Sequence, residues 1–223
     1  MIAAVSDASA PPVPGFVDSA FSPLVHQAVT RCLSARPGDG ARTALVLGSA
    51  MGDATTLDSG SRLLVAGQVH NALLFMQSTA NAVLGRISCD FGVTGPLLSL
   101  SVDGDLADEL LDTAELLLAD EEVERVVVVG VELAATGRAA AAHRGLGTLP
   151  PAADRAVAVL IERGDPLPRA PRDAARTDDT PADDAPADDA RDGRTPHRTT
   201  PAHDYGNLRG LMDLAARIQG TTQ

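Results

Sequence analysis

The segment that most constrains the fold is residues 125–132 (RVVVVGVE), a nearly unbroken β-branched run. A strand that is apolar on both sides must be covered on both faces, which is typical of inner strands in layered α/β sheets. Shorter apolar runs predict three more strands, at residues 43–50, 97–102 and 155–162. Hydrophobic periodicity predicts helices before and between them, at residues 22–35, 54–66, 72–91 and 104–119. This alternation predicts an α/β fold, a layered mixed sheet flanked by helices.

Composition divides the 223 residues into four zones. Residues 1–20 are rich in Pro, Ala and Ser and predict an irregular lead-in. Residues 21–163 carry nearly all of the periodic hydrophobicity and predict one folded domain. Residues 164–203 repeat Pro, Ala, Asp and Arg with hardly any aliphatic side chains. Because such a segment cannot bury enough apolar surface to offset its ordering entropy, it predicts a disordered linker.

The fourth zone, residues 204–223, predicts a C-terminal amphipathic helix with Asp204 as its N-cap. Its apolar side chains fall on one helical stripe, made of Leu208, Leu211, Met212, Ala215 and Ile218. We expect this helix to dock on its own core, and docking on a partner chain is the alternative.

Finer patterns make further predictions for three of the core helices. Ser22 is expected to cap the first helix and Pro23 to begin it. Residues 72–91 are apolar nearly all round and predict a deeply buried helix that carries Cys89 as a small buried hydrophobe. Residues 104–119 place their acidic side chains on one arc. That helix should therefore keep one face in solvent and should not lie between two packed layers.

Charge and residue usage exclude several classes of function. The formal net charge is -12, from 18 basic and 30 acidic residues, which argues against a nucleic-acid binder because little here would neutralise phosphates. Cys32 and Cys89 make neither a disulfide framework nor a metal quartet, and the histidines lack ligand spacing, so no cofactor is implied. No signal-peptide pattern and no membrane-length apolar run occurs. We expect a cytoplasmic protein.

From Leu73 to Glu132 the sequence resembles the N-terminal half of a β-ketoacyl synthase, a condensing enzyme of the thiolase fold. The segments that carry the resemblance are MQSTANAVLGRIS (76–88), FGVTGP (91–96), VVVVGVE (126–132), TALVLGSAMG (43–52) and RAVAVLIE (155–162). Within this broad family the chain is similar to stand-alone proteins that carry only the N-terminal synthase-like domain, in or near polyketide and fatty-acid gene sets. The resemblance implies a thiolase-like half-fold over residues 21–163.

The departures from the family bear on activity. Gap-free counting along the resembling segments puts Gly104 where the family has its nucleophilic cysteine. The chemistry needs a thiol at a strand-to-helix turn, where the helix N-terminus lowers the thiol pKa. Here Asp103 and Asp105 flank a glycine, and they are good helix-start residues instead. The nearest hydroxyl is Ser101, which has no base nearby in the sequence. We therefore assign no catalytic residue, and the enzyme class stays open.

The family also uses two histidines from its C-terminal half, and nothing that resembles their motifs follows Glu162. We expect His143 in a solvated loop and His70 near a helix start. The resemblance further implies surfaces that line an acyl pocket and join two subunits. They would include Phe75, Met76, Gln77 and Asn81.

Three functions are compatible with these observations. The preferred one is a non-catalytic, accessory β-ketoacyl-synthase-like protein of polyketide or fatty-acid assembly, which dimerises with itself or with a synthase-like partner and could engage an acyl carrier protein. The second is an acyltransferase or ketosynthase component completed in trans by a partner subunit, with Ser101 or a partner's residue as nucleophile. The third is a generic α/β ligand-binding module, although neither G-x-G-x-x-G nor G-x-x-x-x-G-K-[ST] occurs.

Overall fold

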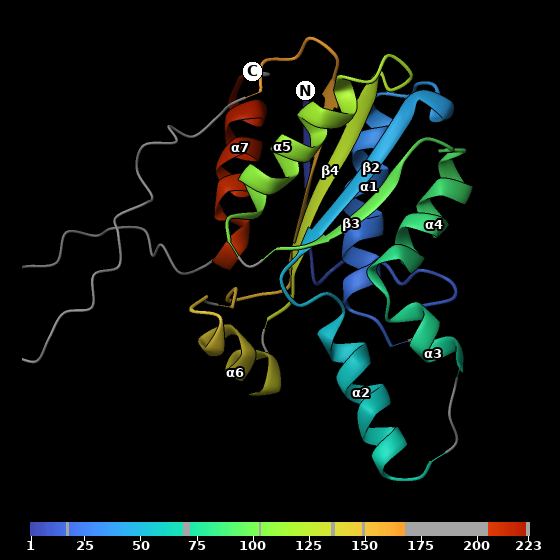
Figure 1. Ribbon diagram of the computed structural model, residues 1–223, viewed down its shortest axis with the longest axis vertical. Helices are drawn as coiled ribbons and strands as arrows, with labels where there is room; N and C mark the ends of the chain where they lie inside the picture. The colour runs from blue at the N-terminus through green and yellow to red at the C-terminus, as the bar shows by residue number, and fades with distance from the viewer. Residues whose placement is uncertain are drawn as a thin grey trace, which may run out of the picture.

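A computed structural model describes residues 1–16, 18–68, 72–102, 104–134, 137–148, 150–167 and 205–221 (Figure 1). The predicted linker lies outside the described residues from residue 168 onward, as do His70, Asp103 and Asp204. None of the helices in the described ranges is both long and apolar enough to cross a membrane.

Five strands form one mixed sheet. They are β1 (Ile2–Asp7), β2 (Thr43–Ser49), β3 (Leu97–Ser101), β4 (Arg125–Glu132) and β5 (Arg155–Glu162). Their order is β1-β5-β4-β2-β3, with β2, β3 and β4 parallel and β5 antiparallel to both of its neighbours. All eight residues of β4 are buried, because the strand lies between β2 and β5 and both of its faces are covered. The predicted layered mixed sheet is confirmed.

The expectation of an irregular lead-in over residues 1–20 is wrong for its first part. Residues Ile2–Asp7 form β1, which pairs antiparallel with β5 from Ile2 opposite Leu160 to Asp7 opposite Arg155. This short strand contains two alanines and a serine, so its β-propensity is weak. Its hydrogen bonds come from the edge of β5, a non-local partner that local patterning cannot reveal.

Two helices cover each face of the sheet (Figure 1). On one face lie α1 (Phe21–Ala35) and α4 (Ala80–Phe91), and on the other lie α5 (Leu106–Leu118) and α7 (Arg209–Thr221). Three more helices, α2 (Ala54–Val65), α3 (Ala72–Gln77) and α6 (Gly137–Gly145), lie beyond the carboxyl ends of the parallel strands (Figure 1). Two 3-10 turns, η1 (Gly40–Arg42) and η3 (Gly206–Leu208), precede β2 and α7. The C-terminal helix therefore docks on its own core, as expected.

Helix α1 begins one residue before the predicted start, and its capping side chain differs. Ser22 lies inside the helix, and its backbone N–H donates to Ser19 Oγ at 2.8 Å. Ser19 therefore supplies the capping oxygen predicted for Ser22, three residues earlier, which is the ordinary spacing from a capping side chain to the amide it satisfies. Pro23 remains in the first turn, where its missing N–H costs nothing.

The single buried helix predicted over residues 72–91 is wrong. The structure has two helices, with Ser78 and Thr79 between them. Ser78 Oγ donates to the carbonyl of Phe75 at 2.7 Å and Thr79 Oγ1 to that of Met76 at 2.9 Å, so both hydroxyls compete for carbonyls that a continuous helix would use. Cys89 is exposed, contrary to expectation, because α4 is an outer-layer helix that buries only one stripe.

Helix α5 follows its prediction closely. Its apolar arc is buried, including Leu106, Leu110 and Ala114, and its acidic arc faces solvent, including Asp108 and Glu109. The helix packs on β2 and β4 with the first arc. One face of the helix is therefore open to water, as predicted.

Candidate functional site

The carboxyl ends of the three parallel strands meet at one edge of the sheet. Ser49 of β2 is in register with Ser101 of β3, and β4 ends beside them at Glu132. Ligands of parallel α/β sheets gather at this edge, because the loops that follow the strands converge there. We therefore take this edge as the candidate site and consider its carboxyls, its turn and its hydroxyls in turn.

Glu132 is the buried carboxyl of this edge. Glu132 is 1 % exposed, and its Oε1 accepts a hydrogen bond from the backbone N–H of Ala50 at 2.6 Å. Burial raises the pKa of Glu132 to about 7, against the Ala50 hydrogen bond, which lowers it. The carboxyl ties the end of β4 to the loop after β2, so it positions that loop and carries a proton close to neutral pH.

The turn from β3 into α5 contains Gly104, and it is anchored on both sides. Before it, the N–H of Val102 donates to the carbonyl of Ser49 at 3.2 Å, and Val102 is buried. After it, Asp105 caps α5 by accepting from the N–H of Ala107 at 2.8 Å. Gly104 itself is exposed, and a Cβ there would meet no atom within 4 Å. The turn has room for a side chain and holds none.

The electrostatics of this turn are those of a carboxylate cap. Burial raises the pKa of Asp105, and repulsion from Asp108 and Asp213 adds to the rise, against the hydrogen bond from Ala107, which lowers it. A neighbouring carboxylate disfavours a second anion at the same helix start. The turn thus begins a helix with a carboxylate cap.

The hydroxyl of Ser101 has no histidine as a partner among the described residues. His26 contacts Asp90 at 2.9 Å, and His143 Nδ1 contacts Thr148 Oγ1 at 2.9 Å. The expectation that His143 sits in a solvated loop is wrong: it lies in α6 and is 1 % exposed. Helix α6 is otherwise rich in alanine and buries its histidine side, where Thr148 satisfies the ring, and burial lowers the pKa of His143.

The four residues assigned to an acyl-pocket or dimer surface lie at one helical corner. Phe75 and Met76 are 73 % and 66 % exposed on α3, Gln77 ends that helix, and Asn81 is exposed at the start of α4. Figure 1 shows α3 on the α4 side of the sheet, whereas α5 and its leading turn lie on the α7 side. All four residues therefore lie near the junction of α3 and α4, away from the turn that contains Gly104.

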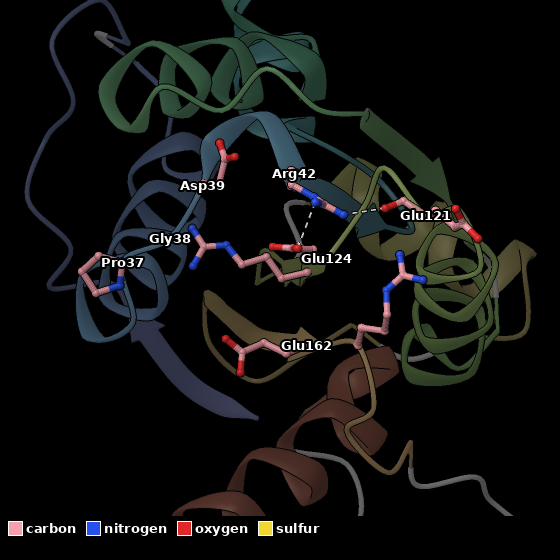
Figure 2. A pocket seen from close by; sticks show the side chains of 9 residues that line it. Pro37, Gly38, Asp39, Arg42, Glu121, Glu124 and Glu162 are labelled. Atoms are coloured by element: carbon pink, nitrogen blue, oxygen red, sulfur yellow. Dashed lines mark hydrogen bonds and ion pairs between the residues drawn. The ribbon is translucent and has the colours of Figure 1, made fainter.

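A charged cavity of about 650 Å³ lies at the opposite edge, where β2 and β4 begin (Figure 2). Arg42 bonds to the Glu124 carboxylate at 3.1 Å and donates to the carbonyl of Glu121 at 2.6 Å. Arg125 is buried, and it donates to Thr43 Oγ1 at 2.7 Å and to the carbonyl of Arg36 at 2.8 Å. These arginines hold the loops before β2 and β4 together, which is a structural role.

Sequence reasoning did not find this cavity. Its lining comes from segments at residues 37–42, 121–125 and 162–163, which are distant along the chain and share no local motif. The one available signal was the position of an arginine and a glutamate at opposite ends of the apolar runs 125–132 and 155–162. Their antiparallel pairing places Arg125 directly opposite Glu162.

Comparison with known proteins supports the fold. No protein-family model and no curated protein sequence matches the chain. Among solved structures, a ketosynthase in complex with its chain length factor from Xenorhabdus doucetiae matches with a TM-score of 0.56 and 20 % identity, over 70 % of this chain and 63 % of that chain. A type II polyketide synthase acyl-carrier protein in complex with its ketosynthase bound to the hexaketide matches with a TM-score of 0.55 and 15 % identity, over 70 % of this chain and 51 % of that chain. The ishigamide ketosynthase/chain length factor matches with a TM-score of 0.55 and 17 % identity, over 74 % of this chain and 49 % of that chain.

These matches define the class of fold. The chain has the thiolase-like α/β fold of ketosynthases and chain length factors, which confirms at the level of structure the resemblance given by the sequence motifs. It spans between about half and just under two thirds of the length of the chains it matches.

Proposed function

We propose that this protein is a ketosynthase-like accessory protein of polyketide or fatty-acid assembly that lacks a condensing nucleophile of its own. The observation that carries the proposal is the turn from β3 into α5, where Gly104 stands in an open position and Asp105 caps the helix. A condensing nucleophile needs a side chain there and a helix N-terminus free to stabilise an anion. In this chain the side chain is missing, and a carboxylate occupies the helix start.

The open acidic face of α5 gives further support. Asp108 and Glu109 are exposed in the first turn of the helix, where negative side chains stabilise the helix dipole in water. Burying such carboxylates under a second protein layer without cationic partners would carry a large desolvation cost. The helix therefore suits a protein that does not close a full synthase core over this face.

We propose that its partner is a synthase-like subunit or a second copy of the chain. Strand β3 is at the end of the sheet, and within the described ranges no strand pairs with its outer edge. Exposed strand edges are normally covered or blocked, and exposed apolar clusters mark interaction surfaces. The corner formed by Phe75, Met76, Gln77 and Asn81 exposes two large apolar side chains. The matched ketosynthases were solved as complexes with a chain length factor or an acyl carrier protein, which supports such a partner and makes a carrier protein a second candidate.

The activity test uses the intact chain with acyl- and malonyl-carrier-protein thioesters, followed by intact mass and product analysis. We expect no condensation product and no acyl adduct on the chain alone. The Cys89→Ser variant is the control, because Cys89 is an exposed thiol that can accept an acyl group without catalysis. A condensation product from the chain alone overturns the proposal. An adduct on Ser101 that appears only with a partner subunit supports completion in trans instead.

The partner test compares two large apolar side chains of similar exposure, on different helices. Phe75→Asp alters the α3 corner, and Leu116→Asp alters α5, where Leu116 is 75 % exposed. We expect Phe75→Asp to weaken self-association, or association with a co-encoded ketosynthase, by at least tenfold, since aromatic anchors carry interface energy. Leu116→Asp should leave the Kd unchanged. If the wild-type protein sediments as a monomer both alone and when mixed with the ketosynthase, the partner assignment is refuted.

A further inference from the structure

The C-terminal segment fits against the candidate site through a glycine on the helix. Gly210, in the first turn of α7, lies so close to the start of α5 that a Cβ there would come within 2.6 Å of Asp105 Oδ1 and 2.7 Å of Ala107 Cβ. Figure 1 shows α7 standing beside α5 on the same face of the sheet. The segment therefore covers the residues that directly follow Gly104.

A second glycine, on the sheet, receives the apolar side of this segment. Leu208 and Leu211 are fully buried above Gly130 of β4, where a Cβ would meet Leu211 Cδ1 at 2.5 Å and Leu208 Cδ2 at 2.8 Å. Gly130 on the sheet and Gly210 on the helix thus allow the close approach of α7, and we call this contact region the seat of the helix. The fit is specific to a helix with leucines three apart and a glycine between them.

Apolar burial holds the helix in this seat. Leu214 and Ala215 are also buried. Gln219 Nε2 donates to the carbonyl of Ala3 at 3.5 Å, and the Arg155 guanidinium lies 5.6 Å from the Tyr205 ring centroid. The segment has 13 helical residues, including Gly210 and Gly220. A helix this short with two glycines is not stable alone in water, so it must fold as it docks.

The covalent connection does not fix the position of α7. Leu167 lines the same cavity as Leu214 and Thr221, so the chain leaves the core near the end of α7, and η3 returns it at the start. The helix is about 20 Å long, whereas a segment as long as residues 168–204 can reach on the order of 100 Å. A segment of this length is compatible with many positions of the helix, so the contacts of α7 decide where it sits.

We propose that residues 205–221 are a tethered ligand helix, and that the face formed by α5, β4 and the β1–β5 strands is a docking site for an amphipathic helix. The resident occupant is this chain's own C-terminal segment, which releases and rebinds while the rest of the core stays folded. Docking packs α7 against Asp105 and Ala107 at the start of α5 and leaves Gly104 exposed. The inference rests on the contacts of α7 and holds whatever the chain does chemically.

The first test is amide hydrogen exchange on the intact chain. A tethered ligand opens separately, so the amides of α7 should exchange at least a hundredfold faster than those of β4. Equal rates for α7 and β4 would mean that the helix opens only with the whole core, and that outcome overturns the proposal.

A matched pair of variants on the same helix tests the seat. Gly210→Ala places a methyl group against Ala107 and Asp105, and Gly220→Ala places one in open space. Both raise helix propensity, so a purely intrinsic effect would slow the exchange of α7 amides in both variants. We expect Gly210→Ala to speed this exchange roughly tenfold or more, because overpacking displaces the helix, and Gly220→Ala to slow it. The same direction in both variants would overturn the described seat.

A third experiment separates docking from covalent linkage. A protease site inserted within residues 168–204 of the full chain allows the connection to be cut after folding. We expect a labelled peptide of residues 205–221 to replace the cut segment in a saturable manner, and to bind the uncut chain far more weakly because the resident helix competes. Loss of the folded core on cutting, or equal peptide binding before and after it, would overturn the proposal. None of these readouts involves acyl transfer, so they are independent of the proposed function.

Discussion

The carboxyl groups at the amino edge and at the carboxyl edge of the parallel strands have different partners. At the amino edge of β2 and β4, carboxylates meet arginines: Glu124 bonds to Arg42 at 3.1 Å, and Glu162 bonds to Arg36. At the carboxyl edge, Glu132 is buried with a single backbone N–H as its partner. No ion pair among the described residues includes Glu132 or Asp105, and burial raises the pKa of both.

This difference shows where the fold is fixed and where it is left adjustable. Charges paired with each other and with backbone carbonyls restrain loops, because removing one partner strands the other. An unpaired buried carboxyl instead makes the folded state sensitive to proton concentration. The arginine–carboxylate pairs of the amino edge therefore brace its loops, and the carboxyl edge holds Glu132, which can respond to pH.

The largest expected loss of stability follows a substitution at the amino edge of the sheet. Arg125→Ala removes the donors to Thr43 Oγ1 and to the carbonyl of Arg36, both at buried or half-buried positions. Stranding two acceptors should lower the free energy of unfolding by on the order of 4 kcal/mol, at roughly 1–3 kcal/mol each plus lost packing. Urea denaturation at neutral pH measures the loss.

Arg62→Ala is the matched control for the brace. Arg62 pairs with Asp58 at 2.7 Å in an exposed position on α2, so its removal should cost less than about 1 kcal/mol. If the two substitutions cost the same, the cavity at the amino edge is not a brace, and its arginines become candidates for binding an external anion.

The next effect is a pH dependence set by Glu132. Its pKa in the folded protein is about 7, against 4.5 for the free group, so the folded state holds a proton that the unfolded state releases. The contribution of protonated Glu132 to the free energy of unfolding is fully present below pH 4.5. It falls by about 3 kcal/mol in all as the pH rises to 7. Glu132→Gln should abolish this fall and make the protein more stable than wild type at pH 8.

The measurement is the free energy of unfolding of both proteins between pH 5 and pH 8. Glu162→Gln is the comparison, because Glu162 pairs with Arg36 at the other edge and should lose stability on neutralisation at every pH in that range. Parallel curves for wild type and Glu132→Gln would show that Glu132 does not titrate on folding. The contrast between the edges would then fail.

The fold was predictable where residues act through local patterning. Four of the five strands lie where apolar runs predicted them, and α5 follows its apolar arc. Strand β1 escaped prediction because its partner β5 lies more than a hundred residues away. The break at Ser78 and Thr79 was missed because hydropathy does not register hydroxyls that bond to the preceding turn.

The candidate site was predictable only in part, for the same reason. Gly104 was assigned by gap-free counting along the segments that resemble the family, and the structure places it between β3 and α5. The closeness of Asp105 to Gly210 could not be predicted, since it depends on a helix that returns from the far end of the chain. The burial of His143 was equally hidden, because Thr148, five residues later, provides the partner that makes burial acceptable.

The smallest effect tests the carboxyl edge directly. Gly104→Cys, in a Cys89→Ser background, places a thiol in open space at the turn before α5. A helix start usually lowers a thiol pKa, but the Asp105 carboxylate next to it should cancel that effect. We expect a thiol pKa at or above the ordinary value of about 8.5, read from the pH dependence of alkylation.

Adding Asp105→Asn to this variant sharpens the result. Asparagine keeps a capping oxygen for the N–H of Ala107 and removes the charge, so α5 should start at the same residue. The thiol pKa should then fall by about half a unit to one unit, the size of one nearby charge at a partly exposed site. A thiol that is already strongly acidic in Gly104→Cys alone would show that the turn can activate a nucleophile, and the carboxylate cap would then no longer support the proposal.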